Sequence, residues 1–201
     1  SSLTITFLET SDVHGMVMPY NFMKAAASPT SLAQVATIVA AEREKAGNEV
    51  VLLDDGDSLQ GQPFVYYYNF EKTGVPHIWG QAVNTLGYAA IGVGNHDIEA
   101  GHAVYDKLYG EVVPPVVCAN ALKADGTPYF KPYTVINRQG VKIAVLGMIS
   151  PWIPNWLPQQ LWSGMTFADM VETAKKWVPI IQKTEKPDIL VGLFHSGADY
   201  T

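Results

Sequence analysis

Short apolar segments alternate with segments of helical periodicity along most of this chain. The apolar segments are four to seven residues long and rich in Val and Ile, which predicts buried strands at 4–8, 50–53, 89–93, 116–119, 133–136, 141–146 and 188–194. Helical patterns occupy 31–45, 77–86, 101–108 and 166–183. Strands followed by helices are typical of a layered α/β fold with a mainly parallel sheet and flanking helices.

The ends of these segments carry specific local signals. Ser31 is expected to cap the first long helix, with Gln34 at the capping-box position. Residues 137–140 have the composition of a hairpin between two strands, and Pro179 is expected to kink or shorten the last helix. The Trp- and Pro-rich segment 151–164 resembles neither helix nor strand, and we interpret it as a packed surface loop or a loop that contacts a ligand or partner.

Composition excludes several classes of protein. The 201 residues are 48% apolar and 16% charged, which predicts a single domain over 1–201 with an ordinary core. The one cysteine, Cys118, is expected to be a buried apolar residue, so no disulfide framework is present. A net charge of −6 without a Lys/Arg cluster argues against binding to nucleic-acid polymers or anionic membranes, and no apolar run is long enough to span a bilayer.

Four of the predicted strands run directly into short polar clusters. These clusters are 11–15 (SDVHG), 54–58 (DDGDS), 92–97 (GVGNHD) and 195–197 (HSG). Because the carboxyl ends of parallel strands lie along one edge of a sheet, we expect the clusters to converge there. Carboxylate, imidazole and amide ligands suit Mn, Fe, Zn or Co better than Ca. We place Asp57 ahead of Asp54 and Asp55 as a ligand, because two acids before Gly-Asp more often hold the loop.

The motif order resembles that of the calcineurin-like metallophosphoesterases. Asp12-x-His14, Gly56-Asp57, the tetrapeptide Gly94 to Asp97 and the strand-end His195 carry this resemblance. The stretch DDGDSLQG over 54–61 and the pair Ala119-Asn120 look more narrowly like the secreted 5′-nucleotidase and 2′,3′-cyclic-nucleotide 2′-phosphodiesterase branch. The resemblance covers essentially the whole chain.

This resemblance implies a binuclear-metal hydrolase that acts on nucleotides or other small phosphoesters. Asp12 and His14 would bind one metal, Asp57 would bridge two, and Asn95 and His195 would bind the second. Asn95 and His96 would contact the phosphate, with His96 acting on the leaving oxygen and Asp97 orienting His96. Two divalent ions about 3.5 Å apart can clamp a phosphate and supply a hydroxide that attacks phosphorus. The resemblance also implies a periplasmic or extracellular location.

The chain departs from the family pattern after His195. Family members carry a further Gly-His-x-His motif and later strands, whereas this sequence ends at Thr201, so we expect an incomplete catalytic domain that is inactive alone. The 5′-nucleotidase branch also has a C-terminal nucleotide-binding domain. Of the remaining histidines, His77 is expected at the surface or in packing, and His102 is a weak candidate for the site.

Two other functions remain open at this stage. The chain could be a non-catalytic scaffold of the same fold that binds a partner, which the absence of the histidine pair and the Trp-rich segment favour. A glycosidase using Asp54, Asp55 or Asp57 is weaker, because it leaves the strand-end His14, Asn95 and His195 unexplained.

Overall fold

The strands form two principal sheets in the computed structural model, which describes residues 3–197. One sheet has the order β1-β4-β5 and is parallel throughout. The other has the order β10-β8-β7, with β10 parallel and β7 antiparallel to β8. Their bounds are β1 Thr4–Thr10, β4 Asn48–Asp54, β5 Ala90–Ile91, β7 Tyr133–Arg138, β8 Val141–Ile149 and β10 Ile189–His195. The α/β class and the predicted hairpin between β7 and β8 are therefore confirmed.

The two sheets pack against each other between two helical layers. Val51 and Leu53 on one face of β4 pack with Val145 of β8 and Leu193 of β10 in one apolar cluster. The opposite face of β4 contributes Leu52 to a larger cluster with three helices, which are α1 (Leu32–Arg43), α3 (Ile78–Leu86) and α5 (His102–Glu111). The outer face of β8 packs on α7 (Met170–Thr184). Because β4 and β8 are buried on both faces, their sequences are nearly continuous apolar runs.

Residues 116–119 join the two sheets instead of forming the regular strand that we expected. The Val117 N–H donates to the Ile91 carbonyl at 2.8 Å, and the Ala119 N–H donates to the Gly147 carbonyl at 2.7 Å. Only isolated bridges form along this segment. Cys118 is buried within it, as predicted.

The last helix begins four residues later than expected. Met165–Phe167 forms strand β9, which pairs with β6 (Ala121–Lys123), and the Asp169 side chain then caps α7. Pro179 does not shorten α7, which continues to Thr184. At the first helix the prediction holds, because the Ser31 hydroxyl accepts the Gln34 N–H.

Several short elements were absent from the sequence prediction. They are β2 (Tyr20–Asn21), β3 (Ala26–Ala27), α2 (Pro63–Tyr66), the π-helical η1 (Tyr67–Glu71), α4 (Asn95–Glu99), α6 (Ile153–Trp156) and the 3-10 turn η2 (Gln159–Leu161). The last two give local helical structure to a segment that we had interpreted as irregular. Within residues 3–197 no helix is long and apolar enough to cross a membrane.

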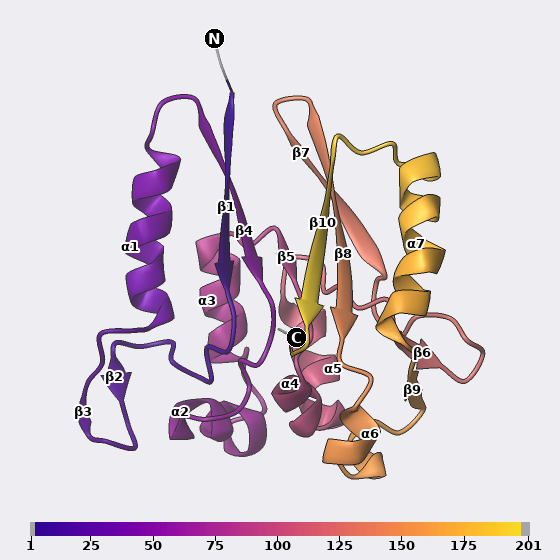
Figure 1. Cartoon of the computed structure of the whole chain (residues 1–201). Helices are drawn as coiled ribbons and strands as arrows, with labels where there is room; N and C mark the ends of the chain where they lie inside the picture. The colour runs from indigo at the N-terminus through magenta and orange to yellow at the C-terminus, as the bar shows by residue number, and fades with distance from the viewer. Residues whose placement is uncertain (1–2, 198–201) are drawn as a thin grey trace.

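The parallel strands of both sheets point the same way. In Figure 1 the arrowheads of β1, β4, β8 and β10 lie toward one end of the molecule, and α2, α4 and α6 surround that end. Backbone pairing sets Thr10 beside Asp54 at the ends of β1 and β4, and His195 beside Ile149 at the ends of β10 and β8. The polar clusters that follow these strands are thus brought to one end, as the sequence predicts.

Candidate metal and phosphate site

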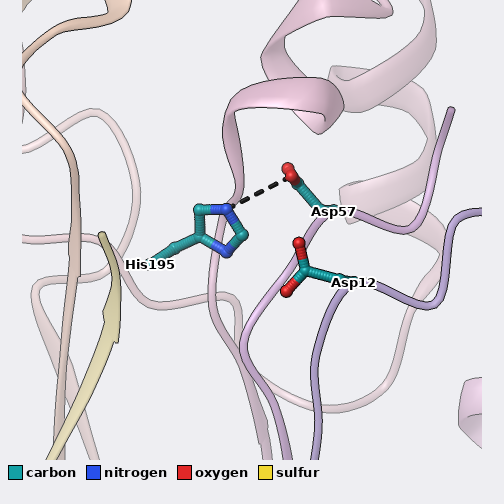
Figure 2. A group of neighbouring side chains, drawn as sticks. All are labelled: Asp12, Asp57 and His195. Carbon is teal, nitrogen blue, oxygen red and sulfur yellow. Dashed lines mark ion pairs between the residues drawn. The ribbon is translucent and has the colours of Figure 1, made fainter. Parts of the chain in front are cut away.

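Three side chains from three strand ends converge at this end of the molecule. Asp12 follows β1, Asp57 follows β4, and His195 is the last residue of β10. Each offers one potential ligand atom, and these atoms lie within 4.8 Å of one another. Figure 2 shows the Asp12 and Asp57 carboxylates beside the imidazole of His195. Two carboxylates and an imidazole are a donor set that transition-metal ions accept.

The loops that present these ligands adopt a backbone conformation unusual for residues other than glycine. Asp12, His14 and Asp57 have φ angles of 52°, 47° and 60°. The Asp12 N–H donates to the Gly56 carbonyl at 3.0 Å, and the His14 N–H donates to the Asp57 carbonyl at 2.9 Å. These bonds hold the β1 and β4 loops side by side. Left-handed backbone at such residues often marks functional sites.

Close contact between two loops requires two of the glycines. Gly56 has a φ of 94°, and a Cβ there would lie 2.3 Å from the Gly94 nitrogen. A Cβ on Gly94 would lie 2.1 Å from an Asp57 carboxylate oxygen. A side chain at Gly56 would therefore push the two loops apart, and a side chain at Gly94 would collide with Asp57.

His195 is held in an orientation suited to ligation. Its Nδ1 lies 2.7 Å from the Asp55 carbonyl oxygen, so Nδ1–H donates and Nε2 is the nitrogen left to bind an ion. Nε2 lies 3.2 Å from Oδ2 of Asp57. Burial lowers the pKa of His195, but the hydrogen bond and charge of Asp57 raise it overall to about 9. Burial raises the pKa of Asp57, but the hydrogen bond and charge of His195 outweigh burial, so the net shift of this pKa is downward. A cation bound here would compete with this proton.

His14 and Asn95 belong to the same cavity. His14 Nδ1 lies 3.0 Å from the Gln60 carbonyl oxygen, and its Nε2 lies 3.7 Å from Asp12 Oδ1. The cavity has a volume of about 340 Å³, and its lining includes Asp12, His14, Asp57, Asn95, His96 and His195. Of the residues that we predicted for the site, only Asp97 is absent from this lining. Asp55, Ser150 and Trp156 also line the cavity, and none of them was predicted as a site residue.

The side chain that contacts the His96 ring is not the one that we predicted. We expected Asp97 to orient His96, but His96 Nδ1 pairs with the Glu99 carboxylate. The buried Asp97 carboxylate instead accepts four backbone N–H groups: those of Asp57 (2.8 Å), Ser58 (2.9 Å), Leu59 (3.1 Å) and Gly94 (2.9 Å). Burial raises the Asp97 pKa and these donors oppose that shift.

The roles of Asp97 and Glu99 follow from their contacts. Through these hydrogen bonds the Asp97 carboxylate joins the Asp57 loop to the Gly94 turn. Glu99 is placed to orient the His96 ring. His96 and Glu99 are three apart in α4, and residues at this spacing are neighbours on a helix. That spacing is the sequence signal that would have identified Glu99.

The Asp54 side chain supports the loop, as we interpreted it. The buried Asp54 carboxylate accepts the Thr10 hydroxyl at 2.6 Å and the Gly56 N–H at 3.0 Å. Burial raises its pKa to about 8. Asp55 borders the cavity, and burial is the main cause of its pKa of about 7.

The two remaining histidines have structural contacts away from the site. His77 is buried and is not at the surface. Its Nδ1 accepts the Trp79 N–H, and its Nε2 lies 2.9 Å from Asn69 Oδ1. Burial lowers its pKa to about 4. His102 lies between Asp106 and the Ser163 carbonyl and does not line the metal cavity.

Known proteins with similar sequences are nucleotide phosphoesterases. The chain is 32% identical to a 2′,3′-cyclic-nucleotide 2′-phosphodiesterase/3′-nucleotidase of Yersinia enterocolitica over 98% of its own length and 32% of the relative. It is also 32% identical to a 5′-nucleotidase of Vibrio cholerae, with 96% of the chain and 34% of the relative covered. The chain thus spans about a third of the length of these curated relatives. No family model matches the chain.

Solved structures agree with this relationship. The calcineurin-like phosphoesterase YfkN of Bacillus subtilis superposes with a TM-score of 0.87 at 27% identity, over 97% of this chain and 63% of that one. A structure described as a putative 5′-nucleotidase from Staphylococcus aureus has the same fold, with a TM-score of 0.87 at 24% identity over 98% of this chain and 38% of that one. The resemblance inferred from the strand-end motifs is therefore confirmed.

Proposed function

We propose that the site hydrolyses phosphoester bonds of nucleotides with divalent metal ions, because the chain is similar in sequence and in fold to nucleotide phosphoesterases. The observation that carries the proposal is the convergence of Asp12, Asp57 and His195 at three strand ends. Relatives named as nucleotidases and phosphodiesterases supply the substrate class.

The chemistry of the donor set suits divalent cations, and we propose that it would hold two of them. Asp12 and His14 would hold one ion, Asn95 and His195 would hold the other, and Asp57 would contribute to both. Such ions supply Lewis acidity and neutralise phosphate charge, which a chain of net charge −6 needs if it is to bind an anion. The orientation of His195 Nε2 by the Asp55 carbonyl supports this assignment.

His96 is placed to act on the leaving group. Its Nδ1 is engaged by Glu99, so Nε2 is the ring nitrogen available to a substrate in the cavity it lines. The proposed role is that His96 donates a proton from Nε2 to the departing oxygen while Glu99 holds the ring. The backbone N–H of His96 donates to Asp57 Oδ1 at 2.8 Å, which joins the proposed acid, His96, to the loop that carries Asp57.

The proposal extends to the longer protein that would contain this chain. Residues 1–201 would form one catalytic domain of a longer protein that also carries a C-terminal nucleotide-binding domain. Partial coverage of the relatives is consistent with such additional parts. We propose a periplasmic or extracellular location for that protein.

Substitution of Asp57 tests the proposal. Asp57→Asn should abolish Mn²⁺-dependent hydrolysis of bis(p-nitrophenyl) phosphate by the longer protein, and it should weaken Mn²⁺ binding to the 201-residue chain in calorimetry. Asp106→Asn is the matched control, because Asp106 pairs with His102 outside the cavity. An unchanged rate and an unchanged isotherm for Asp57→Asn would refute the assignment. A two-site isotherm for the unmodified chain would support the ion pair, and no heat with Mn²⁺ or Zn²⁺ would support the scaffold alternative.

A further inference from the structure

A series of buried hydrogen bonds leads from the start of α3 to the loop that carries Asp57. The Trp79 N–H donates to His77 Nδ1 at 3.1 Å, and His77 Nε2 lies 2.9 Å from Asn69 Oδ1. Asn69 Nδ2 then donates to the Leu59 carbonyl at 2.8 Å, two residues after Asp57. His77, Asn69 and Leu59 are 3%, 4% and 1% exposed. The series is therefore shielded from water along its length.

These hydrogen bonds run in one direction. The His77 ring is neutral at pH 7, because burial lowers its pKa to about 4, so it carries one ring N–H. Its Nδ1 accepts the Trp79 N–H, and the ring proton therefore lies on Nε2, which donates to Asn69 Oδ1. Because Asn69 Oδ1 accepts this proton, the NH2 group of its amide faces the Leu59 carbonyl.

The loop that Asn69 holds also holds His14. The Gln60 carbonyl oxygen lies 3.0 Å from His14 Nδ1, and the Gln62 N–H donates to the His14 carbonyl at 3.2 Å. Gly61 packs directly on this residue, since a Cβ on Gly61 would lie 2.6 Å from the His14 carbonyl oxygen. Because Gln60 accepts from Nδ1, Nε2 is the His14 nitrogen left to face the metal cavity.

We propose that His77 and Asn69 are positioning residues for His14, which set the tautomer in which it binds a metal ion; the inference rests on the proposed function. Asn69 fixes the Leu59 carbonyl, and the next carbonyl of the loop, that of Gln60, is the acceptor for His14 Nδ1. A hydrogen bond to the second ring nitrogen of a metal-binding histidine fixes its tautomer and its orientation. Asn69 lies in the π-helical η1, and such segments are frequent at functional sites.

Two substitutions of His77 separate positioning from simple capping of α3. His77→Asn keeps an oxygen that accepts the Trp79 N–H, as a favoured N-cap residue does, but it loses the donor to Asn69. His77→Gln brings an amide N–H close to the place of Nε2, so it keeps the donor and loses the cap. If His77 only caps α3, His77→Gln should disturb His14 more than His77→Asn does. Positioning through Asn69 predicts the reverse.

Nitrogen NMR of the metal-free 201-residue chain measures the tautomer of His14. At pH 8, above the usual pKa of histidine, the ring proton should lie on Nδ1 in the unsubstituted chain and in His77→Gln. In His77→Asn the His14 ring should become a mixture of the two tautomers. Calorimetry should then show Mn²⁺ binding about tenfold weaker for His77→Asn than for His77→Gln, since loss of such a supporting contact costs about 10–100-fold in affinity.

Three results would overturn the proposal. They are a His14 tautomer that is unchanged in His77→Asn, one that is altered equally in both variants, and Mn²⁺ affinities that are measurable but equal in the two.

The unsubstituted chain gives a check that does not depend on how the variants fold. Its His77 ring should carry the proton on Nε2, and its His14 ring should carry it on Nδ1. A proton on Nδ1 of His77 would reverse the direction of the hydrogen bonds and overturn the proposal. The proposed function fails separately, because the absence of Mn²⁺ binding would count against that function alone, whereas the tautomers are measured without metal.

Discussion

Removing the charge of Asp97 should destabilise the fold from inside the site. Both Asp97 oxygens accept two backbone N–H groups each, from Asp57 and Gly94 on one side and from Ser58 and Leu59 on the other. Asp97→Asn keeps the shape of the side chain but turns one acceptor oxygen into an NH2 donor. Two buried N–H groups then face another donor whichever way the amide is turned.

The size of this effect follows from those two lost bonds. A hydrogen bond to a charged group contributes about 1.5–3 kcal/mol, so the free energy of unfolding should fall by about 3–6 kcal/mol. That is a large part of the roughly 5–15 kcal/mol by which domains are stable. Urea unfolding at pH 7, followed by circular dichroism, measures the change.

Glu99→Gln is the matched control for Asp97→Asn. The Glu99 side chain is 41% exposed and pairs with His96 alone among the described side chains, so its loss should cost under about 1 kcal/mol. If Asp97→Asn lowers the unfolding free energy by no more than Glu99→Gln does, the clamp role of Asp97 is wrong. An equal loss of stability in both variants would likewise refute the distinction between them.

Three further predictions concern Glu99, Gly94 and His77. Glu99→Gln should lower kcat of the longer protein at least tenfold while Mn²⁺ affinity is retained, and a parallel fall in both would contradict a positioning role. Gly94→Ala should weaken Mn²⁺ binding in calorimetry, because its Cβ would collide with Asp57, whereas Gly126→Ala in an open turn should not. His77 has a folded pKa of about 4 against about 6.5 unfolded, so its contribution to stability is lost as pH falls through this window. Between pH 7 and 5 urea unfolding should show a loss of about 2 kcal/mol that His77→Asn lacks, and equal pH dependence in both would refute the buried neutral imidazole.

The convergence of the proposed metal ligands could be predicted in part from strand direction. Asp12, Asp57 and His195 each come after an apolar run, and the ends of parallel strands in one sheet lie along one edge. His195 lies in the second sheet, so its approach also depends on the two sheets packing with their strands in the same direction. The contact between His96 and Glu99 was not predicted, because no helix was expected over Asn95–Glu99. Only once Asn95–Glu99 is a helix do His96 and Glu99 become neighbours.

Tertiary packing also decided features that local patterns leave open. The division into two stacked sheets depends on which strands pair, and periodicity does not encode partners. Residues 166 and 167 fit the helical pattern, but pairing of β9 with β6 fixes them as strand, and Asp169 then caps α7. The buried position of His77 depends on contacts with Asn69, which lies in a π-helical segment without a clear sequence signal.

The bond between His195 and the Asp55 carbonyl joins residues separated by 140 positions. The β10 strand that carries His195 must therefore dock beside β8 before the ligand set exists at all. During synthesis, the segments of Asp12 and Asp57 emerge long before this partner. In the proposed site, the ligand set that includes His195 would therefore be completed late in folding, and an ion bound there would stabilise the docking of β10.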